Sequence, residues 1–174
     1  MPMSELTLRP ATESDADALY ALISAHVAEG HLLPRQLDEL RTHATRFVVC
    51  EQNGAIHACA ELSPLSKDVA EVRSLVVAGA FRRAGVAARL VDELNHMAKA
   101  AGFKSLTAFT HDARFFVRQG FSIVPRTWMT EKVSKDCFTC PFLFGCKQYA
   151  MLLSLEPVER YSGIAPATQR IAVA

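Results

Sequence analysis

Residues 71–90, EVRSLVVAGAFRRAGVAARL, decide the fold, because they join a strand to a helix through a loop rich in small residues. Apolar and β-branched side chains predict a strand over residues 70–77. Apolar side chains at helical spacing predict a long helix over residues 85–101, and Gly102 is typical of its C-terminal cap. The loop at residues 82–87 therefore lies at a helix N-terminus, where free backbone N–H groups and the helix dipole favour an anion.

The loop has two interpretations. Gly85 permits close approach of the backbone, and Ala87 keeps the first helical turn slim. Arg82 and Arg83 add positive charge, so the loop has the features of a cradle for a phosphate or pyrophosphate group. The alternative is an ordinary strand-to-helix turn that carries two solvated arginines. The sequence of the loop alone does not distinguish the phosphate cradle from the ordinary turn.

The rest of the chain alternates between strand and helix patterns. Asn53-Gly54 between two apolar runs predicts the turn of a hairpin. The element order, β-α-α-β-β-β-α-β-α-β-β, indicates a mixed α/β fold. Besides the two elements above, we expect strands at residues 5–9, 46–51, 55–62, 104–110, 121–125 and 148–155, and helices after Ser14, at 36–44 and at 111–119.

Length and charge restrict the class of protein. The chain has 174 residues, of which 50% are hydrophobic and 21% are charged, with a net charge of +1. This is typical of a globular protein and gives no reason to expect nucleic acid or an anionic membrane as a partner. The longest apolar run has about seven residues, whereas a membrane-spanning helix needs about 20. Without an apolar leader, we expect a cytoplasmic protein with one domain at 1–156 and a flexible tail at 157–174.

The five cysteines fall into two groups. Cys50 and Cys59 lie in strand-like apolar runs and are typical of small core residues. Cys137, Cys140 and Cys146 form C-x2-C-x5-C, which is half of a zinc-site pattern without a second C-x2-C pair. We expect no metal and favour structural cysteines, while a zinc site and a redox-active pair stay open as alternatives.

The pattern R-x-x-G-x-A at residues 82–87, after a strand that ends in Leu75-Val76-Val77, resembles the acetyl-CoA motif of the GNAT superfamily of N-acetyltransferases. The resemblance extends over residues 5–155. It implies the GNAT fold, an α/β (α+β) architecture with a central, mixed but mostly antiparallel sheet of about six to seven strands flanked by about four helices. It also implies that acetyl-CoA is the acetyl donor.

Four further blocks resemble the bacterial N-acetylglutamate synthase domain within that superfamily. This likeness implies an amino-acid N-acetyltransferase that acetylates the α-amine of L-glutamate, the first step of arginine biosynthesis. In longer relatives the domain follows an amino-acid-kinase-like domain, so the chain resembles a short, stand-alone synthase. The blocks are GHLLPR (30–35), DVAEVRSLVV (68–77), the pair Phe115-Phe116 and EKVSKDCFTCP (131–141).

The resemblance assigns the acetyl-CoA site residue by residue. A backbone N–H on the strand at residues 75–77 would polarise the thioester carbonyl. Phe116 lies where many GNAT enzymes carry a tyrosine as general acid. Phenylalanine cannot donate a proton, so we expect direct attack by the amine without a side-chain acid. The expected cofactor-binding residues are Leu75, Val76, Val77, Arg82, Arg83, Ala84, Gly85, Val86, Ala87 and Phe116.

The acceptor site must neutralise glutamate, which carries two carboxylates and therefore needs at least two cationic groups. The candidates are Arg35, Arg73 and Lys132, and each could instead be a solvated surface charge. Thr110 and His111, at the end of the fifth strand, are expected on the acceptor side.

The attacking amine must lose a proton, which a nearby carboxylate can accept. Glu71 is the first candidate for this base, and Glu61, on the neighbouring strand, is the second. Glu71 and Arg73 are two residues apart, so they share a face of the strand, and we expect Leu75 and Val77 on that face too. The alternative is an ion pair between Glu71 and Arg73 without a catalytic role.

Other functions fit the same observations. One is a GNAT acetyltransferase for another small amine or amino acid, and another is a non-catalytic acyl-CoA-binding regulator with the same CoA cradle. A third is an interaction module built on the cysteine cluster, which would lose partner binding together with its metal. The expected partners are the small molecules L-glutamate and acetyl-CoA, with a homodimer as an option because GNAT proteins commonly form one.

Overall fold

The computed structural model describes residues 6–157, and the tail expected at 157–174 lies, but for its first residue, outside them. Seven strands form one sheet in the order β1-β2-β3-β4-β5-β7-β6. Neighbouring strands are antiparallel except β4 and β5, which confirms the expected mixed, mostly antiparallel sheet. The strands are β1 (Thr7–Pro10), β2 (Phe47–Gln52), β3 (Ala55–Pro64), β4 (Val69–Val77), β5 (Ser105–Thr110), β6 (Ser122–Val124) and β7 (Tyr149–Ser154).

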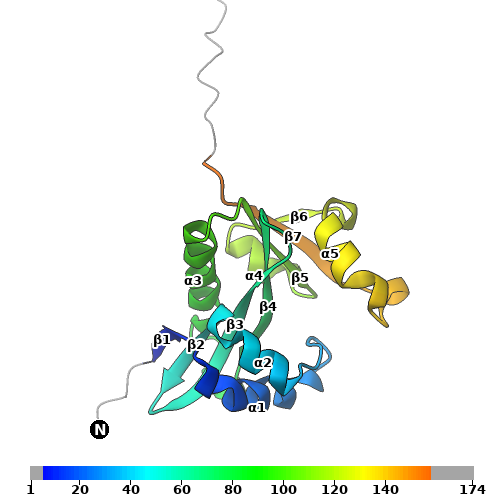
Figure 1. Ribbon diagram of the computed structural model, residues 1–174. Coiled ribbons are helices and arrows are strands. Elements are labelled where there is room, and N and C mark those ends of the chain that lie inside the picture. The colour runs from blue at the N-terminus through cyan, green and yellow to red at the C-terminus, as the bar shows by residue number, and fades with distance from the viewer. Residues whose placement is uncertain (1–5, 158–174) are drawn as a thin grey trace, which may run out of the picture.

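Helices pack on both faces of the sheet (Figure 1). One face carries α1 and α2, whose apolar side chains form a core with Phe47 and Cys59 that we term the α1 core. The other face carries α3 and α4, which enclose the α3 core together with Cys50. Both cysteines are fully buried, as expected. The helices are α1 (Ala16–Val27), α2 (Leu37–His43), α3 (Val86–Ala100), α4 (Ala113–Arg118) and α5 (Thr130–Lys135).

The helix α5 adds a fifth to the roughly four that the sequence predicts. Its six residues, TEKVSK, contain one apolar side chain and therefore show no amphipathic period. In Figure 1 it lies at the far side of the sheet from α3, beyond β7. This position matters for the site, because α5 carries Lys132.

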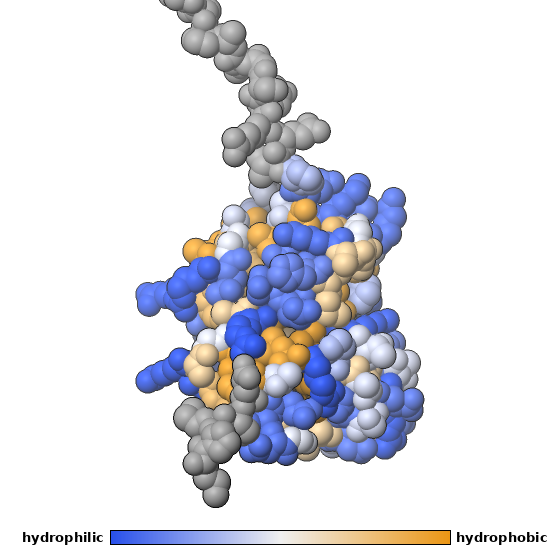
Figure 2. All heavy atoms as spheres, turned by 90° about the vertical axis from the view of Figure 1, so that its left-hand side faces the viewer, coloured by the Kyte–Doolittle hydropathy of each residue, from blue (hydrophilic) through white to orange (hydrophobic). Residues whose placement is uncertain are grey.

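The long helix α3 follows the predicted pattern. Its buried side chains are Val86, Leu90, Val91, Leu94 and Ala98. Figure 2, which looks at the side where α3 lies in Figure 1, shows hydrophilic residues over most of that side with apolar atoms between them. Neither α3 nor any other helix within residues 6–157 is long and apolar enough to cross a bilayer.

The strand β4 contains a bulge opposite β3. Cys59 of β3 pairs with Val76, but Glu61, two residues further along, pairs with Arg73, three residues back. One extra residue of β4 is therefore accommodated between these pairs. Ser74, within the bulge, has a φ of 48°, in the left-handed region that residues other than glycine rarely adopt.

The bulge corrects one prediction. Leu75 and Val77 were expected on the same face of the strand as Glu71 and Arg73. They instead pack against the α3 core, while Val76 belongs to the α1 core. The reason is that one inserted residue inverts the alternation of side chains for the rest of the strand.

The strands β4 and β5 diverge after a short parallel contact. They pair only at their first residues, as far as Glu71 and Thr107. Beyond that point β4 remains paired with β3 up to Val77, and β5 remains paired with β7 up to Thr110. The backbone groups along the later part of β4 on this side are therefore not taken up by β5.

Candidate active site

A cavity of about 850 Å³ opens where β4 and β5 diverge. Its walls come from β4, the end of α1 and the loop that follows, the end of β5, the start of α4, and the segment from α5 to β7. Segments far apart in the sequence thus meet around one hollow. Of the residues expected in the site, those that line the cavity are Arg35, Glu71, Arg73, Leu75, Val76, Val77, Arg82, Ala87, Thr110, His111, Phe116 and Lys132.

The loop before α3 has the geometry of an anion site. The backbone φ is positive at Arg83 (65°) and at Gly85 (75°), with Ala84 between them outside that region. Such alternation can direct successive backbone N–H groups at one anion. Gly85 is the N-cap of α3, so the unpaired N–H groups of the first helical turn follow directly. The side chain of Val86 is buried, so this residue can contribute only its backbone.

The side chain of Arg82 is engaged rather than free. Its Nη2 donates to both carboxylate oxygens of Glu29 at 2.8 Å, and its Nε donates to the carbonyl of Val77 at 3.0 Å. The hydrogen bond from Arg82 holds the pKa of Glu29 below its ordinary value. Arg82 thus connects the chain after α1 to the loop, and a bound phosphate would share this cation with Glu29.

A cluster of charged side chains, Glu71, Arg73 and Lys132, also lines the cavity. Glu71 is 3% exposed, and Lys132 Nζ lies 2.8 and 2.9 Å from its two carboxylate oxygens. Lys132 also donates to Asp136 at 2.7 Å. Arg73 is held more loosely, at 3.9 Å from Glu71 and 3.7 Å from Asp136. Among these cations Arg73 has the most weakly engaged donors.

The environment shifts the pKa values of the two carboxyl groups in opposite directions. Burial raises the pKa of Glu71, although the charge and hydrogen bond of Lys132 oppose the shift. Burial also acts to raise the pKa of Asp136, but there Lys132 and Arg73 outweigh it and the pKa lies below its ordinary value. Glu71 is therefore the more basic carboxylate of the two, as a proton acceptor requires.

Arg35 is fixed by three partners. Its Nη1 donates to Glu61 and to Ser74 Oγ, both at 2.7 Å. Its Nε and Nη2 donate to the two oxygens of Glu39 at 3.2 and 2.7 Å. Glu61 is only 1% exposed and does not line the cavity, so the second candidate base lies behind Arg35 rather than beside the acceptor.

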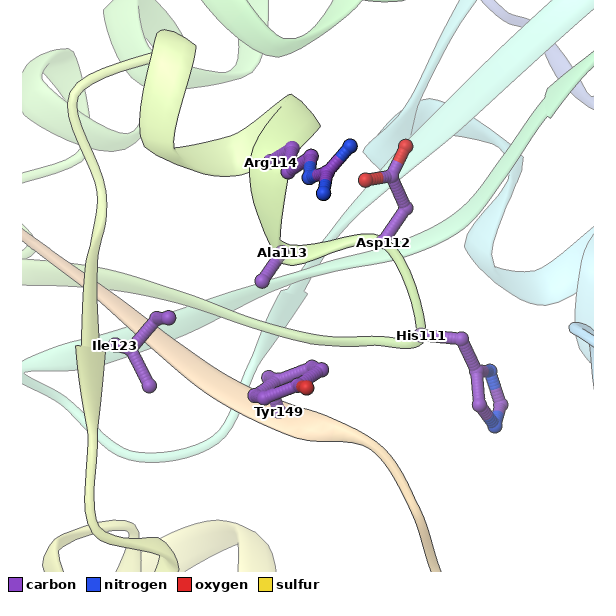
Figure 3. A pocket seen from close by; sticks show the side chains of 6 residues that line it. All are labelled: His111, Asp112, Ala113, Arg114, Ile123 and Tyr149. Carbon is purple, nitrogen blue, oxygen red and sulfur yellow. The ribbon is translucent and has the colours of Figure 1, made fainter.

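Thr110 and His111 lie at the cavity mouth, where β5 ends. Thr110 Oγ1 accepts the N–H of Asp112 at 3.0 Å and so shapes the turn into α4. The Nδ1 atoms of His111 and His31 are 3.4 Å apart. A second hollow of about 390 Å³ lies beside this turn. Figure 3 shows the side chains that line it, among which the imidazole of His111 points away from the others. The remaining residues that line this hollow are Asp112, Ala113, Arg114, Ile123 and Tyr149.

Phe116 forms part of the cavity wall. It is 5% exposed. Its ring packs edge-on against Phe115 and Phe121, at centroid distances of 5.0 and 5.2 Å. An apolar ring in an apolar cluster can hold the shape of the wall but cannot donate a proton.

The cysteine cluster lies beside the same cavity. Cys140 and Cys146 line it, and Cys137 begins the turn that follows α5. The thiols are free, and burial raises the pKa of Cys137, which lowers its thiolate fraction. No three His, Cys, Asp or Glu side chains are arranged to hold a metal ion in the part of the chain that the structure describes. Cys140 and Cys146 therefore form part of the wall of the cavity, whereas Cys137 lies beside it.

Three residues of the site were not predicted. Asp136, the residue that follows α5, binds Lys132 from four residues away, and Glu39 binds Arg35 at the same spacing. This i,i+4 spacing is a signal that the sequence contains. Ser74 had no signal, because serine is not typical of a left-handed backbone and the bulge depends on the partner strand.

The chain can now be placed among known proteins. Residues 8–121 match the family described as the acetyltransferase (GNAT) family. The chain therefore belongs to the GNAT acetyltransferase family, as the resemblance implied, and the seven-stranded mixed α/β architecture is the GNAT fold.

Two curated relatives are N-acetyltransferases, one of them an amino-acid acetyltransferase. An uncharacterized N-acetyltransferase of Chlorobaculum tepidum is 27% identical over 155 residues, which are 89% of this chain and 100% of that protein. An amino-acid acetyltransferase of Ralstonia nicotianae is 34% identical over 116 residues, which are 66% of this chain and 26% of that protein. The chain thus matches only about a quarter of the length of this amino-acid acetyltransferase.

Two solved structures share the fold. N-acetylglutamate synthase from Neisseria gonorrhoeae, solved with coenzyme A and N-acetyl-glutamate, has a TM-score of 0.78 at 24% identity, over 88% of this chain and 36% of that chain. Rv2747 from Mycobacterium tuberculosis, solved with CoA and a second ligand, has a TM-score of 0.73 at 25% identity, over 85% of this chain and 98% of that chain.

Proposed function

We propose that this protein transfers the acetyl group of acetyl-CoA to the α-amine of L-glutamate. The observation that carries the proposal is the buried Glu71, held by Lys132 and flanked by Arg73, in the same cavity as the loop before α3. One wall of the cavity suits the diphosphate of CoA, and the other offers a proton acceptor beside cations. The amino-acid acetyltransferase of Ralstonia, at 34% identity, supports an amino acid as the acceptor.

The cofactor half of the proposal rests on backbone groups. The pyrophosphate of acetyl-CoA binds the N–H groups at residues 83–87, with Arg82 beside them, at the N-terminus of α3. The pantetheine arm lies along β4 at Leu75, Val76 and Val77, where β5 has diverged. A backbone N–H of the bulged part of β4 then stabilises the oxyanion that forms on the thioester carbonyl.

The chemical step follows from this placement. Glu71 accepts a proton from the ammonium group of the acceptor, directly or through water. The free amine attacks the thioester carbon, a C–N bond forms and the C–S bond breaks. The products are the N-acetylated amino acid and the CoA thiol. The nitrogen loses its second proton as the amide forms, and the leaving thiolate takes up that proton through water, because Phe116 has none to donate. No bond between the acetyl group and the protein is required.

In the acceptor site, the two carboxylates of glutamate bind cationic side chains. Arg73 is the first partner, because its guanidinium is held only at 3.7 and 3.9 Å and is free to turn toward a substrate carboxylate. Lys132 is the second, and Thr110 and His111 border the acceptor from the mouth of the cavity. Arg35 is not assigned a substrate carboxylate, because its donors are already engaged by Glu39, Glu61 and Ser74.

A second candidate is the same reaction on an amino acid with one carboxylate. It is favoured by the neutralisation of Lys132, which already contacts Glu71 and Asp136. If both contacts persist when substrate binds, Arg73 is the one cation among Arg35, Arg73 and Lys132 whose donors no group within residues 6–157 holds by a hydrogen bond. The two candidates differ in the acceptor and not in the chemistry.

The experiment is a survey of acceptors with the purified protein. Release of the CoA thiol from acetyl-CoA is followed with each of the standard amino acids, and the N-acetylated product is identified by mass spectrometry. We expect glutamate to have a kcat/KM at least about tenfold above any other amino acid. A higher value for an acceptor with one carboxylate would select the second candidate. CoA binding without thiol release for any amino acid would overturn both and indicate a non-catalytic regulator.

A further inference from the structure

Ser74 occupies a backbone conformation that its own side chain does not favour. Its φ of 48° lies in the left-handed region, and it sits in the bulge where β4 has one residue more than β3. A serine stays in such a conformation only when its surroundings hold it there. The question is which contacts hold it.

Two side chains contact Ser74 from opposite ends. Arg35 Nη1 donates to the Ser74 hydroxyl oxygen at 2.7 Å, and Cys59 Sγ donates to the Ser74 carbonyl at 3.5 Å. The contact from Arg35 is the stronger one, because it is short and charge-assisted. The hydroxyl of Ser74 is thus attached to a cation that comes from the loop after α1, far from β4 in sequence.

Arg35 is itself immobilised. It is 6% exposed, and Glu61, which is 1% exposed, accepts from the same Nη1 at 2.7 Å. Glu39 accepts from Nε and Nη2, and the guanidinium carbon lies 5.9 Å from the ring centroid of Phe47. Four of the five N–H donors that a guanidinium has are therefore occupied by the protein. A substrate carboxylate bound in a bidentate manner would have to displace Glu39 or Ser74.

We propose that Arg35 is a positioning residue that holds the bulge of β4, and that it does not bind the acceptor. The inference rests on the proposed function for its consequence, because the bulge sets which groups of β4 meet the thioester. Before the bulge, Glu71 and Arg73 face the acceptor wall, and beyond it the alternation of side chains is inverted. By holding the bulge, Arg35 sets how Glu71, before the bulge, lies relative to the oxyanion-binding backbone of β4 beyond it.

The first measurement compares Ser74→Ala with Arg35→Lys in the acetyl-transfer assay. Ser74→Ala removes the acceptor of the Arg35 contact and leaves the charge of Arg35 in place. We expect kcat to fall about tenfold in each variant, with the KM for glutamate unchanged within about threefold. Arg41→Lys, a change on the exposed face of α2, is the matched control and should leave both constants unchanged.

The double variant tests whether the two residues act as a unit. Arg35→Lys combined with Ser74→Ala should be no slower than the slower single variant, because both remove the same contact. A KM for glutamate raised at least about tenfold in Arg35→Lys, with Ser74→Ala unaffected, would show that Arg35 binds the acceptor and would overturn the inference.

Hydrogen exchange keeps this test separate from the proposed function. If the wild-type protein acetylates no amino acid, the proposed function fails, but the bulge can still be examined. The amide exchange of Ser74 and Leu75 should become faster in Arg35→Lys and in Ser74→Ala, while Arg41→Lys leaves it unchanged. Exchange that is unchanged in both variants would overturn the role of Arg35 whatever the substrate is.

Discussion

The loop before α3 and the charged cluster around Glu71 line the same cavity but are assembled in different ways. The loop consists of consecutive residues, and its anion site is made by backbone groups that any similar sequence would place in the same way. The cluster takes Glu71 from β4, Lys132 from α5 and Asp136 from the residue that follows α5, and it depends on side chains. We therefore expect binding of the donor to depend on a local stretch of the chain, and selection of the acceptor to depend on how the molecule is packed.

The difference predicts that changes in the two regions affect different constants. Substitutions in the loop should act on acetyl-CoA binding and leave the chemical step intact. Substitutions in the cluster should act on the chemical step or on the acceptor and leave CoA binding intact. Variants in each region can therefore show whether donor binding and acceptor chemistry are separable.

The substitution Glu71→Gln should give the largest effect. It removes the proton acceptor while Lys132 keeps Asp136 as a partner, so we expect kcat/KM for the acceptor to fall about 10²- to 10⁴-fold. The dissociation constant of CoA, measured by calorimetry, should change by less than about twofold. Glu93→Gln, an exposed change on α3, is the control. Equal loss of CoA binding in Glu71→Gln would contradict the division.

The substitution Lys132→Met should move the pH dependence of the reaction. Burial raises the pKa of Glu71 and Lys132 opposes this shift, so removal of the cation should raise that pKa further. A protonated Glu71 cannot accept the amine proton. The acid limb of kcat/KM should therefore move to higher pH, and activity should recover as the pH rises.

The control for this shift is Lys135→Met, one helical turn further on the same α5, where the ammonium donates to the carbonyl of Pro64. Its pH profile should match that of the wild-type protein. An acid limb that stays in place in Lys132→Met would mean that a group other than Glu71 accepts the proton.

The substitution Gly85→Ala tests the loop against a matched glycine. Gly85 and Gly102 lie at the two ends of α3 with φ values of 75° and 81°, and no atom within 4 Å would meet an added Cβ at either. Each change to alanine should lower the free energy of unfolding by about 1 kcal/mol, because of the left-handed backbone. Only Gly85→Ala should raise the KM for acetyl-CoA, by about tenfold, because only there does the phosphate approach the backbone. A similar rise in Gly102→Ala would remove the loop from the CoA site.

The substitution Glu29→Gln should give the smallest effect. Arg82 is shared between Glu29 and the expected phosphate, so neutralising Glu29 should lower the KM for acetyl-CoA by less than about fivefold. Both side chains are largely exposed, so the difference from the wild-type protein should shrink as the salt concentration rises. An increase in the KM would indicate that Glu29 orients Arg82 for the phosphate instead of competing with it.

The sequence-based predictions succeeded for features set by consecutive residues and failed for features that depend on packing between distant residues. All seven strands were predicted because each has its own period or apolar run, and the Asn53-Gly54 turn was confirmed by positive φ at both residues. The short helix α5 was missed because its sequence lacks an apolar face. The face of Leu75 and Val77 was assigned wrongly, because a bulge adds a residue to one strand only in relation to its partner.

The candidate acceptor residues show where the sequence was insufficient. Arg35, Glu61, Glu71, Arg73 and Lys132 were all named from residue type and resemblance, and the structure brings them into two neighbouring networks. Which cation already has protein partners could not be predicted. That depends on side chains 26 to 61 residues apart in the chain, which only packing brings within 3 Å.

The amino-acid sequence alone specified the order of the seven strands and of helices α1 to α4, the loop that opens α3 and the membership in the GNAT family, because each depends on residues that are close together in the chain. Only the tertiary structure decided that β4 is bulged at Ser74, that α5 brings Lys132 to Glu71, and that Arg35 is enclosed by Glu39, Glu61 and Ser74. The physical reason is that hydrogen bonds and burial between distant residues depend on atomic distances, and a linear pattern of residue types does not specify those distances.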